Sequence, residues 1–133
     1  MSNVRLTNIT RVYPEGGGIR DFSCDIQEGE FFALLGPSGC GKTTILRSIA
    51  GLETLDGGTI HFGDRDVTHS PPEQRKAAMV FQSYALFPHM NVFENVAFGL
   101  RAQKMEKSLI GPRVAECLTL VQLEGLDKRP VTD

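Results

Sequence analysis

Apolar and polar residues follow one another along the first part of the chain in patterns that predict β-strands. Residues 22–26 and 59–62 alternate apolar and polar positions, which is typical of a strand with one buried face. Residues 31–35 form a short apolar run suited to a buried strand. Residues 4–9 and 77–81 are two further strand candidates.

Three later segments have the pattern of helices. Residues 43–50 carry apolar side chains on one helical face, and a glycine follows as a C-cap. Asn91 and Glu94 have the spacing of a capping box, which predicts a helix over residues 92–100. Residues 112–121 repeat apolar positions at i, i+3, i+4 and i+7, which predicts another helix.

Length and composition are those of one ordinary soluble domain. Of the 133 residues, 41% are hydrophobic and 23% are charged, so the chain can bury a core. The net charge of −2 provides no positive field for holding nucleic acid or an anionic membrane. The first residues lack the apolar segment of a signal peptide, and no run approaches the roughly 20 apolar residues of a membrane span. We therefore expect a cytoplasmic protein without a nucleic-acid partner.

The three cysteines do not have the spacing of a disulfide framework or of a zinc site. Cys24, Cys40 and Cys117 are odd in number and far apart in the sequence. This spacing predicts free thiols in a reducing compartment.

The most informative motif lies between a predicted strand and a predicted helix. Residues 36–43 match G-x-x-x-x-G-K-[S/T], the phosphate-binding P-loop, without a mismatch. Backbone N–H groups of such a loop cradle phosphates at a helix N-terminus. Lys42 is expected to reach the β- and γ-phosphates, and the Thr43 hydroxyl is expected to bind Mg²⁺. The predicted contacts with the nucleotide come from Ser38, Gly39, Cys40, Gly41, Lys42, Thr43 and Thr44.

Several further motifs occur in a fixed order around this loop, and together they resemble the nucleotide-binding domain of ABC transporters. The matching segments are GPSGCGKTT at 36–44, LRSIAGLE at 46–53, GGTI at 57–60, PPEQR at 71–75 and MVFQSYALFPHM at 79–90. The chain looks most like the ATPase subunits of bacterial importers for sugars, polyamines or ferric iron. The resemblance implies an α/β P-loop NTPase with a RecA-like core, an antiparallel β addition and the start of a helical subdomain. We expect the core with its β addition over residues 1–82, and the incomplete helical part over 83–133.

The resemblance also implies roles for individual residues. Tyr13 stands where the family has an aromatic residue that stacks on adenine. Gln82 matches the glutamine that contacts Mg²⁺ and the attacking water, so Lys42 and Gln82 are the predicted catalytic residues. Four residues of the segment after Gln82 are predicted to contact a membrane-spanning permease: Tyr84, Leu86, Phe87 and Met90. From the residues alone, burial in the core is an equal alternative for these four.

The family's signature segment and its later acidic residues do not occur in the 133 residues. The resemblance therefore implies a truncated domain that is inactive alone. The intact protein would bind ATP and Mg²⁺, pair as a homodimer and hydrolyse ATP at the inner face of the cell membrane. A soluble ABC-type ATPase without a membrane subunit, or a fragment that only binds nucleotide, are the alternatives. A GTPase is disfavoured, because no Asn-Lys-x-Asp motif is present.

Overall fold

The structure is a computed structural model that describes residues 3–132. The chain divides into two compact units, Met1–Met79 and Val80–Asp133. The first unit contains the sheet and the P-loop segment, and the second contains two longer helices.

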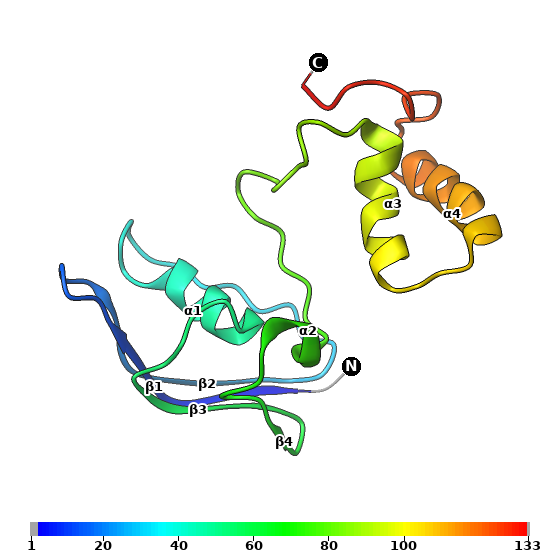
Figure 1. The fold of residues 1–133 in the computed structure, drawn as a ribbon. Helices are drawn as coiled ribbons and strands as arrows, with labels where there is room; N and C mark the ends of the chain where they lie inside the picture. The colour runs from blue at the N-terminus through cyan, green and yellow to red at the C-terminus, as the bar shows by residue number, and fades with distance from the viewer. Residues whose placement is uncertain (1–2, 133) are drawn as a thin grey trace. The chain divides into compact units, whose positions relative to one another are not determined.

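The first unit is built on a four-stranded antiparallel sheet in the order β2-β1-β3-β4 (Figure 1). Its strands are β1 (Val4–Val12), β2 (Gly18–Ile26), β3 (Gly57–Phe62) and β4 (Arg65–Asp66). Neighbouring strands pair in antiparallel register, with Leu6 opposite Cys24 on one side and Ile60 on the other. The predicted strands at 4–9, 22–26 and 59–62 are confirmed, and each is longer in the structure.

One helix covers a face of this sheet and closes the core. Helix α1 (Lys42–Ala50) contributes Ile45 to a buried cluster with Leu6, Ile9 and Ile60 (Figure 1). The helix ends at Gly51, whose φ of 79° is the left-handed C-cap conformation expected from the sequence. A short helix, α2 (Pro72–Arg75), follows β4. Burial of one apolar face of α1 against the sheet therefore fixes the helix that begins in the P-loop.

The strand predictions at 31–35 and 77–81 are wrong for the part of the chain that the structure describes. Neither segment forms a strand, and Phe31 and Leu35 are 97% and 92% exposed. A strand exists only where a neighbouring strand completes its backbone hydrogen bonds. An apolar run alone does not supply that neighbour, so these residues leave a large exposed apolar surface.

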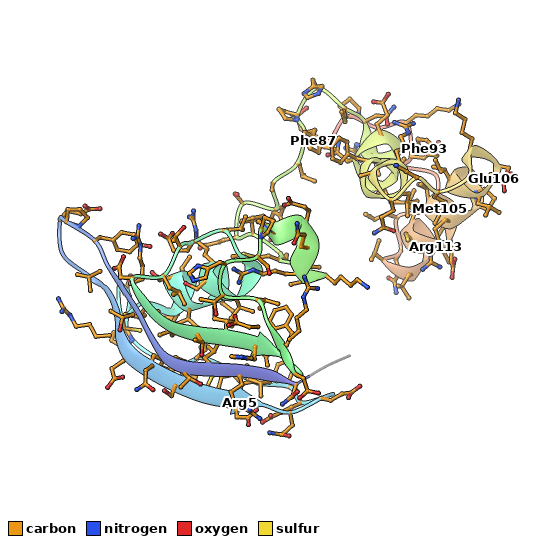
Figure 2. The ribbon with its side chains drawn as sticks, turned by 60° about the horizontal axis from the view of Figure 1, so that its bottom comes forward. Arg5, Phe87, Phe93, Met105, Glu106 and Arg113 are labelled. Carbon is orange, nitrogen blue, oxygen red and sulfur yellow. The ribbon has the colours of Figure 1, made fainter. Side chains whose placement is uncertain are left out.

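The second unit packs α3 (Val92–Ala102) against α4 (Lys107–Leu120). Its buried residues are Ala97, Ile110, Val114 and Leu118, and Phe93 and Met105 pack against them (Figure 2). The capping box predicted for α3 is confirmed, since the side chains of Asn91 and Glu94 each accept the other's backbone N–H.

The helix predicted over residues 112–121 begins five residues earlier in the structure, at Lys107. Ile110 extends the buried face of α4 by one turn toward the N-terminus. Pro112, which favours the first turn of a helix, consequently lies inside α4.

Candidate functional site

The P-loop segment leads directly into the N-terminus of α1. Gly41 is the N-cap residue, with φ of 94°, and its carbonyl accepts a hydrogen bond of 2.9 Å from the backbone N–H of Ile45. A Cβ at this position would lie 2.4 Å from Cγ2 of Ile19 and 2.8 Å from the carbonyl oxygen of Gly18. Both the backbone conformation and the close approach of β2 therefore require glycine here. The result is a helix N-terminus that begins at the loop, where its free N–H groups favour an anion.

The ammonium group of Lys42 bonds back to the start of the P-loop. Its Nζ donates to the carbonyl oxygens of Gly36 at 2.6 Å and Pro37 at 2.7 Å, and lies 3.5 Å from Sγ of Cys40. The first turn of α1 contains no acidic residue. The ammonium and the helix dipole thus add positive potential at the same place, which suits a phosphate group.

Tyr13 and Thr44, two residues predicted to contact nucleotide, lie next to each other in the structure. The Tyr13 hydroxyl is 3.5 Å from Oγ1 of Thr44 in the first turn of α1. Tyr13 immediately follows β1, and the backbone N–H of Tyr13 donates to the carbonyl of Gly17 at 3.4 Å. The structure therefore brings the aromatic ring and the P-loop helix together, although they are 31 residues apart.

Thr43 remains exposed in the first turn of α1, beside the loop. Residues 3–132 contain no group of three or more His, Cys, Asp or Glu side chains able to hold a metal by themselves. Mg²⁺ at nucleotide sites is bound by one or two protein oxygens together with phosphate oxygens and water. The exposed Thr43 hydroxyl fits that role, and it requires phosphates as the other ligands.

Gln82 belongs to the second unit, where it is exposed in a turn that follows Phe81. Its contact with Mg²⁺ and water stays a prediction. Cys24, Cys40 and Cys117 are free thiols, as expected from their spacing. Burial and the neighbouring Asp25 carboxylate raise the pKa of the Cys24 thiol.

The four predicted partner-interface residues differ in exposure. Tyr84 and Leu86 are exposed, whereas Phe87 and Met90 are half-buried. The Phe87 ring packs against Phe98 of α3 with 4.5 Å between ring centroids. Phe87 therefore anchors the segment to α3 and leaves Tyr84 and Leu86 available on the surface.

Asn95 holds the turn formed by residues 87–90 in place, although no motif in the sequence points to this role. Its Oδ1 accepts the backbone N–H of Phe87 at 2.9 Å, and its Nδ2 donates to the carbonyls of Phe87, Met90 and Asn91 at 3.0 to 3.1 Å. One amide thereby fixes both ends of the 87–90 turn on the first turn of α3. The only hint in the sequence is an asparagine just inside a predicted helix start, where such a residue can bond to the preceding backbone.

No helix among residues 3–132 has the length and apolar character needed to cross a membrane.

Comparisons with known proteins show the family to which the chain is similar. The family model described as ABC transporter matches residues 19–133. The chain is 55% identical over 128 residues to the spermidine/putrescine import ATP-binding protein PotA of Aggregatibacter actinomycetemcomitans, covering 96% of this chain and 34% of that protein. It is 52% identical over 128 residues to the sulfate/thiosulfate import ATP-binding protein CysA 2 of Agrobacterium fabrum (strain C58 / ATCC 33970), covering 95% and 38%.

A solved structure has the same fold. The dimeric structure of a post-hydrolysis state of the ATP-binding cassette MJ0796, bound to ADP and Pi, superposes with a TM-score of 0.83 at 27% identity. The match covers 97% of this chain and 62% of that one. The chain spans about a third of the length of the curated relatives it matches. On these matches, and with a P-loop that opens α1, the chain belongs to the ABC transporter family.

Proposed function

We propose that this chain is the ATP-binding portion of an ATPase subunit that powers an importer. The observation that carries the proposal is the P-loop cradle, in which the Lys42 ammonium and the N-terminus of α1 converge on one loop. The relatives supply the direction, since those compared above are named as import ATP-binding proteins.

In this proposal the nucleotide is bound from both ends by residues of the first unit. The triphosphate accepts hydrogen bonds from the backbone N–H groups of residues 38–44 and from the Lys42 ammonium, which exchanges its bonds to the Gly36 and Pro37 carbonyls for bonds to phosphate oxygens. The adenine stacks on Tyr13. The 3.5 Å approach of Tyr13 to Thr44 supports this arrangement, because it brings the ring close to the first turn of α1.

Hydrolysis is phosphoryl transfer to water, in which positioning and charge stabilisation supply most of the rate. Bound Mg²⁺ would neutralise charge on the β- and γ-phosphates, with Thr43 as its ligand from this chain. Lys42 stabilises negative charge that grows on the transferred phosphoryl oxygens. Gln82 orients the attacking water.

The partners proposed for the intact protein are a second copy of the subunit and membrane-spanning permease subunits, which would hold it at the inner face of the cell membrane. The dimeric state of the solved relative supports the first. Exposure of Tyr84 and Leu86, just before the 87–90 turn that Asn95 fixes, supports the second. Relatives of 55% and 52% identity are named for spermidine/putrescine and for sulfate/thiosulfate, so this portion serves importers of different cargo.

The test is ATP turnover by the protein as its gene encodes it, with Lys42→Ala as the variant. Loss of a positioned charge that contacts the reacting phosphoryl group is expected to lower kcat by at least about 100-fold. Lys104→Ala, which removes an exposed lysine after α3, is the matched control and is expected to keep turnover. Near wild-type turnover by Lys42→Ala would refute the role assigned to the P-loop, and absence of turnover in the wild type with its permease present would refute the function.

A further inference from the structure

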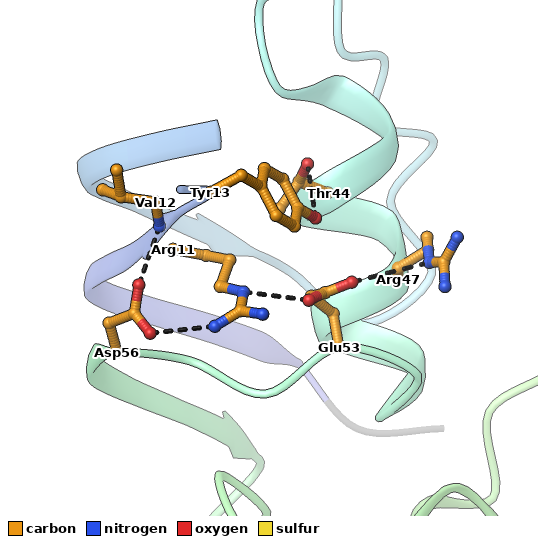
Figure 3. A network of polar contacts seen from close by, with 7 residues as sticks. All are labelled: Arg11, Val12, Tyr13, Thr44, Arg47, Glu53 and Asp56. Carbon is orange, nitrogen blue, oxygen red and sulfur yellow. Dashed lines mark hydrogen bonds and ion pairs between the residues drawn. The ribbon is translucent and has the colours of Figure 1, made fainter. Parts of the chain in front are cut away.

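The Tyr13 ring has a cation on one of its faces. The guanidinium carbon of Arg11 lies 5.2 Å from the centroid of the Tyr13 ring (Figure 3). Arg11 lies near the end of β1, and Tyr13 immediately follows the strand, two positions further along the chain. This separation is within the range in which a cation is attracted to an aromatic face.

Two carboxylates fix that guanidinium. Arg11 Nε donates to Oε1 of Glu53 at 2.9 Å, and its Nη1 donates to Oδ1 of Asp56 at 2.9 Å (Figure 3). The other Asp56 oxygen accepts the backbone N–H of Val12 at 2.7 Å, and the second Glu53 oxygen lies 3.8 Å from Arg47. Arg11 is therefore held by the loop that follows α1, more than 40 residues away in the chain.

The opposite end of the Tyr13 side chain is also held. Its hydroxyl lies 3.5 Å from Oγ1 of Thr44, which is only 8% exposed. The ring is thus restrained at its hydroxyl by α1 and over one face by Arg11. A flat ligand can stack only on the face that Arg11 does not cover.

We propose that Arg11 is a positioning residue for adenine, which acts by fixing the Tyr13 ring and leaving one defined face for the base. The inference rests on the proposed function, because it needs an adenine nucleotide at the P-loop. Two physical effects support it. A ring held in one rotamer loses less conformational entropy when the base stacks on it. A cation on one face also draws π-electron density toward itself, which lowers the repulsion between the other face and the electron-rich face of a purine.

Two ligands separate this role from a general structural role. ATP carries the base, whereas tripolyphosphate offers only the phosphates to the P-loop. Arg11→Met keeps an apolar side chain of similar length and removes the cation. In the protein as its gene encodes it, we expect this variant to bind Mg-ATP about 5- to 10-fold more weakly, because the Tyr13 ring must then be ordered on binding. We expect the affinity for Mg-tripolyphosphate to change less than about twofold.

Three further variants decide the assignment. Arg11→Lys restores the cation and is expected to recover most of the ATP affinity. In a Tyr13→Ala background, Arg11→Met is expected to have no further effect, because the two residues act as a unit. Arg5→Met is the control, since Arg5 is on the same strand and pairs with Asp25 at 3.5 Å on the solvent-exposed side (Figure 2).

Equal losses for ATP and tripolyphosphate, or losses of Arg11→Met and Tyr13→Ala that simply add, would overturn the proposal. If Arg11→Met does not fold, Glu53→Gln decides it, because this change loosens the guanidinium and is expected to lower ATP affinity in the same selective way. A wild-type protein that binds neither ligand would instead refute the proposed function and is recognised by that result.

Discussion

Arg75 is a buried cation whose hydrogen bonds within residues 3–132 all go to backbone carbonyls, and its removal tests how the P-loop helix is held. The residue is 4% exposed. Its Nη1 donates to the carbonyls of Ser48 at 2.6 Å and Ile49 at 3.1 Å, at the C-terminal end of α1. Its Nη2 donates to Thr68 at 3.0 Å and its Nε to Ser70 at 2.8 Å. One side chain thus connects the end of α1 to the segment between β4 and α2.

The expected cost of Arg75→Met follows from these bonds. The bonds to the Ser48 and Thr68 carbonyls are buried, so water cannot readily replace the lost donor. A buried acceptor left without its donor costs about 1–3 kcal/mol, which gives about 2–6 kcal/mol for the two. Burial lowers the pKa of Arg75, which reflects the cost of removing its charge from water. The methionine variant avoids that cost, so we expect a net loss in the lower half of the range, about 2–4 kcal/mol.

Native-state hydrogen exchange of peptides from residues 45–52 measures this loss where it arises. A loss of 2–4 kcal/mol corresponds to exchange that is about 30- to 900-fold faster in the last turns of α1. Gly51→Ala perturbs the contact between Arg75 and the end of α1 from the other side, since a Cβ there would lie 2.6 Å from Nε of Arg75 and φ at this position is +79°. Arg65→Met is the control, because Arg65 is exposed and makes one bond of 3.2 Å to the Gln74 carbonyl. If Arg75→Met exchanged as slowly as Arg65→Met, the guanidinium would not hold α1 and the reasoning would be refuted.

Three further predictions concern other parts of the fold. Hydrogen bonds from the backbone of Val12 and from the Arg11 guanidinium lower the pKa of Asp56, so its contribution to stability is present at neutral pH and is lost as pH falls below about 4. Urea titrations between pH 5 and pH 2 should show a smaller loss of stability for Asp56→Asn than for the wild type, and an unchanged pH profile would contradict this. Gly58→Ala places a Cβ 2.5 Å from the backbone oxygen of Asn8 in β1, at φ +86°, and should lower the free energy of unfolding in urea by more than about 2 kcal/mol. A Cβ at Gly57 meets nothing within 4 Å, so Gly57→Ala should cost less than about 0.5 kcal/mol. Similar values for both variants would contradict the register of β1 with β3. Asn91→Ala removes the N-cap of α3 and should lower the stability by about 1 kcal/mol in thermal unfolding. A variant that melts at the wild-type temperature would contradict this prediction.

The elements that the sequence predicted well are those whose signals are local. Alternation of apolar residues predicted two strands of the sheet, at 22–26 and 59–62, and cap residues predicted the ends of two helices, at Gly51 and Asn91. The phosphate loop was recognised from eight consecutive residues, because its chemistry depends on short-range spacing. Local periodicity and local chemistry are therefore sufficient for these features.

The features that the sequence did not predict depend on contacts between distant segments. The strand predictions at 31–35 and 77–81 rest on local sequence alone, yet a strand also needs a partner, and none pairs with them among residues 3–132. Arg11 meets Glu53 across 42 residues, and Arg75 meets Ser48 across 27. Such pairs follow from the register of the sheet and the placement of α1, which no local pattern specifies.

The central claim is that backbone N–H groups of residues 38–44 hold a triphosphate at the N-terminus of α1. Hydrogen exchange of the protein as its gene encodes it, with and without Mg-ATP, tests this claim most directly, because a phosphate-bound amide exchanges slowly. We predict that Mg-ATP slows exchange in peptides covering residues 36–45, that Lys42→Ala weakens this protection, and that exchange across β3 is unchanged. Protection that is absent from residues 36–45, or that appears only elsewhere in the chain, would contradict the account.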